Sequence, residues 1–149
     1  MNDKTGSRAH WSFWAIGAVA LVWNVMGALN FFMQMNVDAL ARMPETQRAI
    51  IESRPAWATA AFAVVVFCGV IGCLLLLLKK TAAYYLFLAS LLGVVVQIIP
   101  YLGASRSAFA GSPLMISMYI IVPLAVAAFL AWYAKRAERK GWMNLPQRQ

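Results

Sequence analysis

Two long apolar runs joined by a pair of lysines decide the fold: AWATAAFAVVVFCGVIGCLLLLLKKTAAYYLFLASLLGVVVQIIP, residues 56–100. A helix needs about 20 apolar residues to cross about 30 Å of hydrocarbon, and each run approaches or exceeds this length. Because only residues 79–81 separate the runs, the two helices must form an antiparallel hairpin. We therefore predict membrane spans over residues 56–78 and 82–103.

Two further apolar runs flank this hairpin, at residues 11–34 and 113–134. Hydrophobic residues make up 62% of the 149-residue chain and charged residues 12%, whereas a soluble domain is about half apolar and about a quarter charged. The predicted fold class is all-α: a four-helix transmembrane bundle that forms a single membrane domain over residues 1–149.

The longest loop, residues 35–55, contains the pattern of a short helix. Pro44 suits a first helical position and Glu45 a first turn, while Ile50 and Ile51 lie on one side among polar neighbours. This pattern predicts a short amphipathic helix in the first extracytoplasmic loop, lying at the membrane surface or covering the bundle.

Two prolines fall within the predicted spans. Pro100 should bend or end the third helix near its outer end, and Pro123 should kink the fourth near its middle. In a protein that changes conformation, these two residues are the predicted hinges. The basic segment 135–149 is predicted to be a cytoplasmic tail.

The distribution of basic residues predicts the orientation. The net charge is +8, and nine of the thirteen Lys and Arg residues lie on the side that carries both termini. Cytoplasmic loops hold the excess of Lys and Arg in membrane proteins, so both termini should be cytoplasmic. The expected partner is the lipid bilayer. No basic stripe interleaved with aromatic residues suggests a nucleic acid.

No Asp, Glu, Lys, Arg or His falls inside any predicted span. Charged groups in a membrane are usually kept for ion or proton work, so exporters that need an embedded carboxylate are excluded. The single histidine, His10, precedes the first span and excludes haem bundles that need helical histidines. Cys68 and Cys73 form no CxxC motif. We predict no catalytic residue, cofactor or metal, and no enzyme activity.

The spans do carry neutral polar residues, which form a candidate intramembrane cluster: Asn24, Asn30, Gln34, Ser90, Gln97 and Ser117. Three interpretations are open. The side chains could hydrogen-bond neighbouring helices together, line a small polar cavity for a neutral solute or lipid group, or contact a partner subunit. A second set of small residues should let helices approach closely: Gly27, Gly69, Gly72, Cys73 and Gly93.

Three sequence elements resemble a widespread family of small bacterial four-helix inner-membrane proteins, over most of residues 15–100. The elements are W-N-x-x-G in the first helix (Trp23, Asn24, Gly27), P-x-W opening the second (Pro55, Trp57), and G-x-x-G-S/C before a Leu run and basic residues (Gly69, Gly72, Cys73, Leu74 to Leu78, Lys79, Lys80). The resemblance implies the four-helix topology and a bacterial inner membrane. Some members of this uncharacterised family carry a "sugar transporter" label.

Two functions follow as predictions. The first is a non-enzymatic accessory protein that binds a partner in a larger membrane complex. The alternative is a transporter or channel for a small neutral, sugar-like solute, which would need a homo-oligomer because one bundle of this size has little interior. The sequence specifies neither the ligand nor the partner.

Overall fold

The computed structural model describes residues 9–103, 114 and 117–143 and confirms the all-α four-helix bundle. Four long helical segments build it: α1 (Trp11–Met35), α4 (Ala56–Leu77), α5 (Ala82–Gly103), and the π-helical turn η1 (Ser117–Ile121) that continues as α7 (Val122–Arg139). Each of the four is long and apolar enough to cross a membrane. The chain is therefore a multi-pass membrane protein by length and composition.

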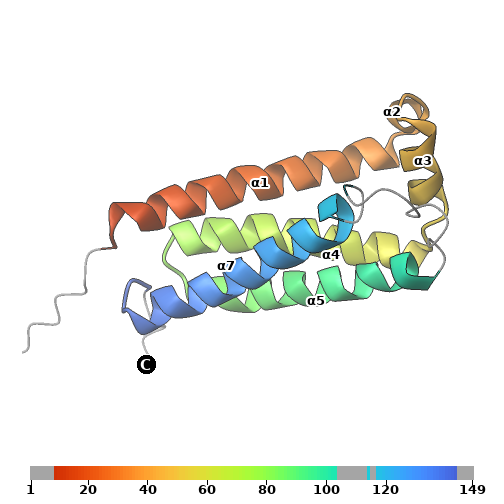
Figure 1. Ribbon diagram of the computed structural model, residues 1–149. Helices are drawn as coiled ribbons and strands as arrows, with labels where there is room; N and C mark the ends of the chain where they lie inside the picture. Colours follow the sequence, from red (N-terminus) through yellow and green to blue (C-terminus); the bar gives the residue numbers. More distant parts are fainter. Residues whose placement is uncertain (1–8, 104–113, 115–116, 144–149) are drawn as a thin grey trace, which may run out of the picture.

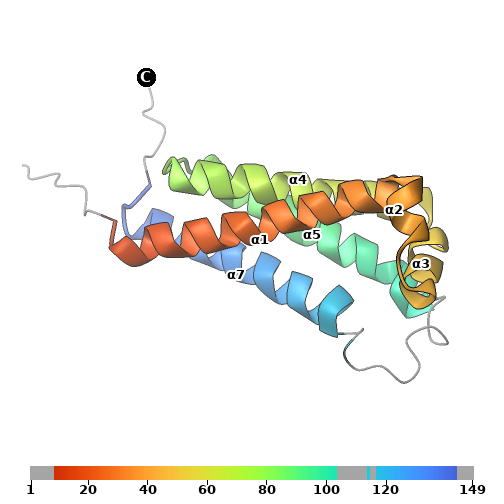
Figure 2. The same ribbon diagram turned by 90° about the horizontal axis from the view of Figure 1, so that it is seen from above.

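The four segments pack in chain order. α1 lies on α4, α4 pairs antiparallel with α5, and α5 lies on α7 (Figure 1). The start of α1, the α4–α5 turn and the end of α7 lie together at what we call the turn end. Two short helices, α2 (Val37–Ala41) and α3 (Glu45–Glu52), lie at the opposite end, the α3 end. Figure 2 shows α7 turning away from α1 toward the α3 end.

The buried core is concentrated at the turn end. Phe13, Leu76 and Phe87 are at most 1% exposed, and the Phe13 and Tyr133 rings stack with their centroids 6.3 Å apart, which joins α1 to α7. Met143, beyond α7, folds back into the same cluster. Buried side chains therefore fill the interior of the bundle at the turn end.

The α4–α5 turn is made by a lysine in a conformation that favours glycine. Lys79 has φ of 58°, and its N–H donates to Leu76 O at 2.9 Å while that of Lys80 donates to Leu75 O at 2.8 Å. These two bonds satisfy carbonyl groups in the last turn of α4 and form a Schellman motif. The tight turn positions α5 against α4 without a longer loop.

The predicted helix in the first loop is present as α3, with Ile50 and Ile51 buried. The preceding helix α2 was not predicted. It forms because the Asn36 side-chain oxygen accepts from the Asp38 and Ala39 N–H groups at 3.0 and 3.1 Å, which caps a helix start. Together α2 and α3 lie across the α3 end of the bundle (Figure 1).

The two prolines behave differently. α5 continues through Pro100 to Gly103, so this proline does not end the helix. Pro123 lies in the first turn of α7, directly after η1. The predicted irregularity in the fourth segment therefore takes the form of a π-helical turn, a rare feature found often at functional sites.

The helix of the fourth segment continues beyond the predicted span. α7 runs to Arg139, so the tail predicted from residue 135 begins as helix. The hydrophobic run stops at residue 134, but the helix continues because Ala137 is still fully buried. Gly141, with φ of 70°, follows its C-cap. The predicted start of this span, at residue 113, lies outside the described residues.

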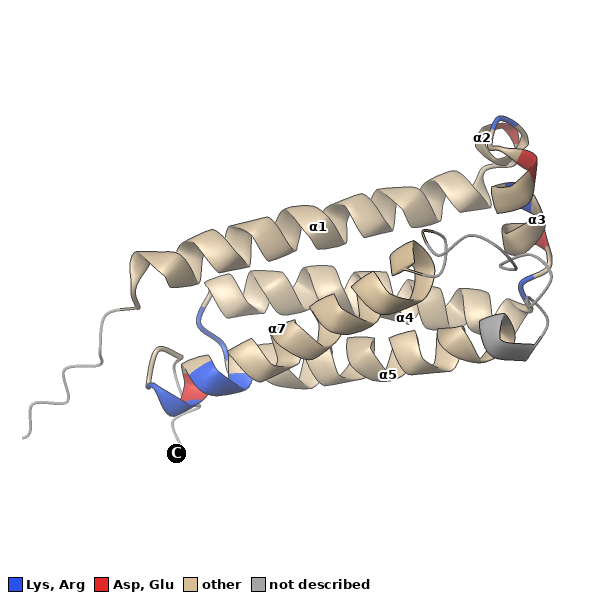
Figure 3. Cartoon of the chain, viewed as in Figure 1, with Lys and Arg blue, Asp and Glu red and all other residues tan. Residues whose placement is uncertain are grey.

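Charged residues of the described ranges gather at the two ends of the bundle (Figure 3). Lysines and arginines dominate the turn end, whereas acidic and basic residues alternate along α2, α3 and the loop before α4. The long apolar middle agrees with a membrane-spanning arrangement.

Candidate functional site

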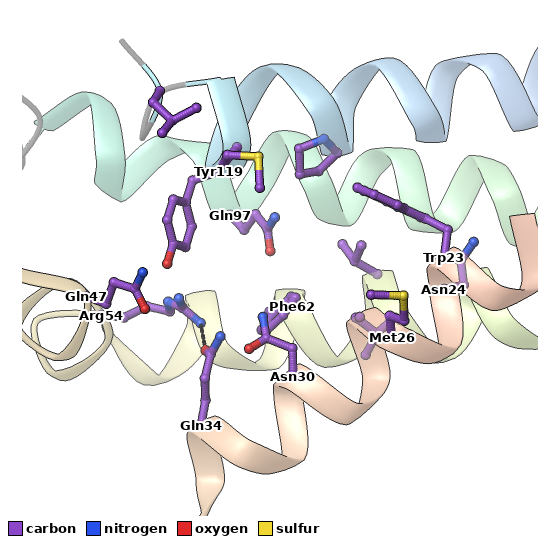
Figure 4. Close-up of a pocket in the computed structure, with 16 residues that line it drawn as sticks. Trp23, Asn24, Met26, Asn30, Gln34, Gln47, Arg54, Phe62, Gln97 and Tyr119 are labelled. Atoms are coloured by element: carbon purple, nitrogen blue, oxygen red, sulfur yellow. Dashed lines mark hydrogen bonds between the residues drawn. The ribbon is translucent and has the colours of Figure 1, made fainter. Parts of the chain in front are cut away.

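A cavity of about 560 Å³ lies at the α3 end of the bundle. It opens where α7 diverges from α1, and residues from every long helical segment and from α3 line it (Figure 4). The lining residues are Trp23, Asn24, Met26, Gly27, Asn30, Gln34, Gln47, Arg54, Phe62, Val65, Val66, Gln97, Leu114, Met118, Tyr119 and Pro123. Its size is within the range of small-molecule sites in proteins.

The cavity is polar at one end and apolar at the other. Figure 4 places Gln47, Arg54 and Tyr119 at one end and Trp23 with Met26 at the other. On α1, Gln34 and Trp23 are eleven residues apart, about 16 Å at 1.5 Å per residue. The polarity therefore changes over about half the thickness of a hydrocarbon core.

Arg54 brings a positive charge to the polar end. Its Nη1 donates to Gln34 Oε1 at 3.1 Å, and its guanidinium lies 5.3 Å from the centroid of the Phe62 ring. Among the described residues that line the cavity, Arg54 is the one that carries a charge. A cationic group surrounded by amides and a ring favours an anion in the same space.

Gln97 is the buried amide of the cavity. Its side chain is 8% exposed, and Figure 4 shows it pointing from α5 into the cavity. It makes no hydrogen bond to any residue within the described ranges. Buried polar groups are normally hydrogen-bonded, so this amide is free to bind a group inside the cavity.

Asn24, by contrast, is occupied by the protein itself. Its Nδ2 donates to Ala20 O at 2.8 Å and to Cys73 Sγ at 3.5 Å, the second bond joining α1 to α4. Gly69 lies directly opposite, where an added Cβ would overlap the Asn24 Oδ1 atom. Asn24 therefore lines the cavity but acts as a helix-joining residue.

The remaining members of the predicted polar cluster are divided. Asn30 and Gln34 line the cavity, whereas Ser90 is buried elsewhere and donates from its Oγ to Val65 O at 3.0 Å, joining α5 to α4. Ser117 is half-buried in η1 and is not a lining residue. The structure thus brings together four of the six residues: Asn24, Asn30, Gln34 and Gln97.

The predicted small residues lie at close helix contacts. An added Cβ at Gly93 would come within 2.8 Å of Val65 and 3.1 Å of the Ala61 carbonyl, so α5 and α4 approach through it. Gly72 would meet the Phe87 ring at 2.8 Å. Gly27, with Val66 at 3.4 Å, also lines the cavity, and Cys73 is fully buried beside Asn24.

Three polar lining residues lie outside the predicted polar cluster: Gln47, Arg54 and Tyr119. Gln47 and Arg54 fall in the first loop, where charges beside a span are ordinary. Arg54 could have been predicted to lie close to the bundle, because it directly precedes Pro55 at the start of α4. Tyr119 falls on the fourth predicted span, two residues after Ser117.

An apolar groove continues from the cavity toward the turn end. It has a volume of about 380 Å³ and lies between α1 and α7. Its lining residues are Ala15, Ile16, Val19, Ala20, Trp23, Val126, Phe129 and Leu130. Trp23 lines both spaces, so the groove begins where the apolar end of the cavity stops.

No group of three or more His, Cys, Asp or Glu residues within the described ranges could hold a metal ion. Comparisons with protein-family models, with curated proteins and with solved structures gave no match.

Proposed function

We propose that this membrane protein binds a small polar or amphipathic molecule in the cavity between α1 and α7. The observation that carries the proposal is Gln97, an amide 8% exposed that faces the cavity without a hydrogen bond to the described chain. Leaving such an amide without a partner once a ligand has excluded water from the cavity costs about 1–3 kcal/mol. A ligand that accepts or donates a hydrogen bond there would offset that cost.

Binding in such a cavity favours transport, the second of the two predicted functions. One wall is formed by η1 and Pro123, an irregular segment that can change its path more easily than a regular helix. Pro100 and Pro123 remain the proposed hinges. Arg54 adds a charge that the predicted neutral solute does not require, so the range of candidate ligands extends to anions.

The binding proposal can be tested by thermal unfolding of the full chain in detergent. The added compounds are a panel of neutral sugars and of carboxylate and phosphate compounds, short and long. We expect at least one class to raise the unfolding midpoint, and Gln97→Leu to abolish the rise. The control is Val96→Leu, at an exposed neighbouring position of α5. If no class raises the midpoint, the binding proposal fails.

A second candidate is the accessory role, and the poor burial of α1 favours it. In its most apolar stretch, 17% of α1 is buried, against 28–33% in the other three spans. A helix so weakly held by its own bundle has a wide surface for a partner subunit or a second copy. The native mass of the mildly extracted protein tests this role, because other polypeptides in the assembly would support it.

We also propose a bacterial inner membrane with both termini in the cytoplasm. The resemblance to small bacterial membrane proteins supports the first part, and the lysines and arginines at the turn end support the second. Protease treatment of intact spheroplasts provides the test. Cleavage in the α2–α3 segment with both ends of the chain protected is the expected pattern, and the reverse pattern would contradict this orientation.

A further inference from the structure

We propose that the cavity ligand is a lipid-like anion: a single acyl chain that ends in a carboxylate or phosphate. Its charged head would lie beside Arg54, Gln34 and Gln97, and its chain would extend past Trp23 into the groove between α1 and α7. This inference rests on the proposed binding function and names the chemical class of the ligand.

The negative charge of the ligand head is inferred from the polar end of the cavity. Arg54 is the charged residue among the described lining residues, and amides supply further N–H donors. Gln34 uses its oxygen to accept from Arg54, which leaves its Nε2 group to donate to another acceptor. Gln97 adds a second unused amide. A concentration of donors around one positive charge selects an oxyanion over a cation or a neutral group.

The acyl chain of the proposed ligand is inferred from the apolar end of the cavity. Beyond Gln97, the lining includes the Met26 and Trp23 side chains (Figure 4). The amide available at that depth, Asn24, already donates to Ala20 O and Cys73 Sγ. A sugar placed there would bury hydroxyl groups without hydrogen-bond partners, at a cost that an alkyl chain avoids.

The direction in which the acyl chain would extend is inferred from the groove between α1 and α7. Trp23 lines both the cavity and the groove, so a chain that passes this indole leaves a polar space and enters an apolar one. The eight residues that line the groove include no charged or amide side chain. From Gln34 to Ala15 the path follows nineteen residues of α1, about 28 Å, which is close to the thickness of a hydrocarbon core, about 30 Å. Such a ligand lies parallel to the bilayer lipids and can enter sideways between α1 and α7.

The test compares compounds that have both the acyl chain and the anionic head with compounds that have only one of the two. Native mass spectrometry of the full-length chain, released from maltoside micelles, counts bound copies of oleate and of oleoyl lysophosphatidate. Oleyl alcohol has the chain without the charge, and acetate and inorganic phosphate have the charge without the chain. We expect one bound copy of each lipid anion, with affinities at least about tenfold above those of the other three probes.

Two pairs of variants locate the ligand. Arg54→Gln should weaken lipid-anion binding at least about tenfold, whereas Arg42→Gln, at an exposed residue of the same loop, should not. Arg54→Lys, which keeps the charge, should retain most of the affinity and shows that the loop still folds. Ala15→Phe fills the groove and should weaken binding of the long chain, whereas Ala18→Phe, exposed on the same helix outside the groove, should not.

Each contrary result has a distinct meaning. Equal binding of oleyl alcohol would overturn the assignment of the head, and equal binding of acetate or phosphate would overturn that of the chain. Release of a second polypeptide by Ala15→Phe would assign the groove to a partner helix and overturn the inference. Failure of all five probes would overturn it too, while a rise in the unfolding midpoint with a sugar would leave the binding function intact.

Discussion

Arg54 and Gln34 join two segments that are distant in the chain: the Arg54 Nη1 group donates to Gln34 Oε1 at 3.1 Å. Gln34 lies in the last turn of α1 and is 5% exposed, while Arg54 lies just before α4. This bond connects the α3 end of α1 to the start of the hairpin. It also holds the guanidinium at the polar end of the cavity.

Replacing the acceptor should therefore destabilise the α3 end. We expect Gln34→Leu to lower the free energy of unfolding by about 1.5–3 kcal/mol, because a hydrogen bond to a charged group is lost in a buried place. Titration with a denaturing detergent measures the change. The matched control is Gln47→Leu, another lining amide, for which we expect less than about 0.5 kcal/mol. Equal losses in the two variants would contradict a special role for the Arg54–Gln34 bond.

Asn24 and Gly69 should be energetically coupled across α1 and α4. Gly69→Ala places a methyl group onto the Asn24 side chain, so we expect a loss of about 1–3 kcal/mol. Asn24→Ala should cost about 0.6–2 kcal/mol, because its bond to Cys73 is lost.

The double variant distinguishes a steric conflict from two independent losses. With Asn24→Ala in place, the side chain that obstructs the new methyl group is shorter, so Gly69→Ala should cost markedly less than it does alone. A double-mutant cycle of unfolding free energies gives the coupling directly. Simple additivity of the two losses would show that Gly69 is not required by Asn24.

Lys79→Gly should stabilise the α4–α5 turn. The φ of 58° at Lys79 is strained for a side chain and free for glycine. We expect a gain of a few tenths to about 1 kcal/mol, reduced by the lost contact of the Lys79 Nζ atom with the Trp14 ring, 5.7 Å from its centroid. Lys80→Gly removes the same charge at a residue without positive φ and should give no gain. A gain of equal size in Lys80→Gly would attribute the effect to charge.

The sequence predicted the helices well because a bilayer imposes a simple length and polarity requirement on them. The same argument does not locate the end of a helix that continues out of the apolar region. α7 continues through Lys135 to Arg139, since buried alanines rather than hydropathy decide where its packing stops. α2 was missed because it depends on one capping side chain, Asn36.

The site was only partly predictable for a different reason. Helical periodicity placed Asn30 and Gln34 on one face, but it could not show that α7 turns away from that face and leaves a cavity. Nor could it distinguish Asn24, which bonds across to Cys73, from amides that face open space. Arg54 enters the site through the path of the chain before α4, and local sequence patterns do not specify such tertiary placement.

The contrast between Gln97 and Ser90 gives the sharpest test of a binding role. Both are buried on α5, seven residues apart and thus on the same face. The Ser90 hydroxyl donates to Val65 O at 3.0 Å, whereas the Gln97 amide has no such partner among the described residues. Ser90→Ala should therefore lower the free energy of unfolding by about 0.5–1.5 kcal/mol.

Gln97→Leu should do the opposite in protein freed of ligand. It replaces an amide that lacks a protein partner by an apolar group of similar size, so stability should stay unchanged or rise. The same substitution should weaken ligand binding, because the buried donor is gone. Stability and binding would then change in opposite directions, which is expected where a protein keeps an unfavourable polar group for function. If Gln97→Leu instead lowers stability as much as Ser90→Ala does, the amide is a structural element of the bundle and not part of a binding site.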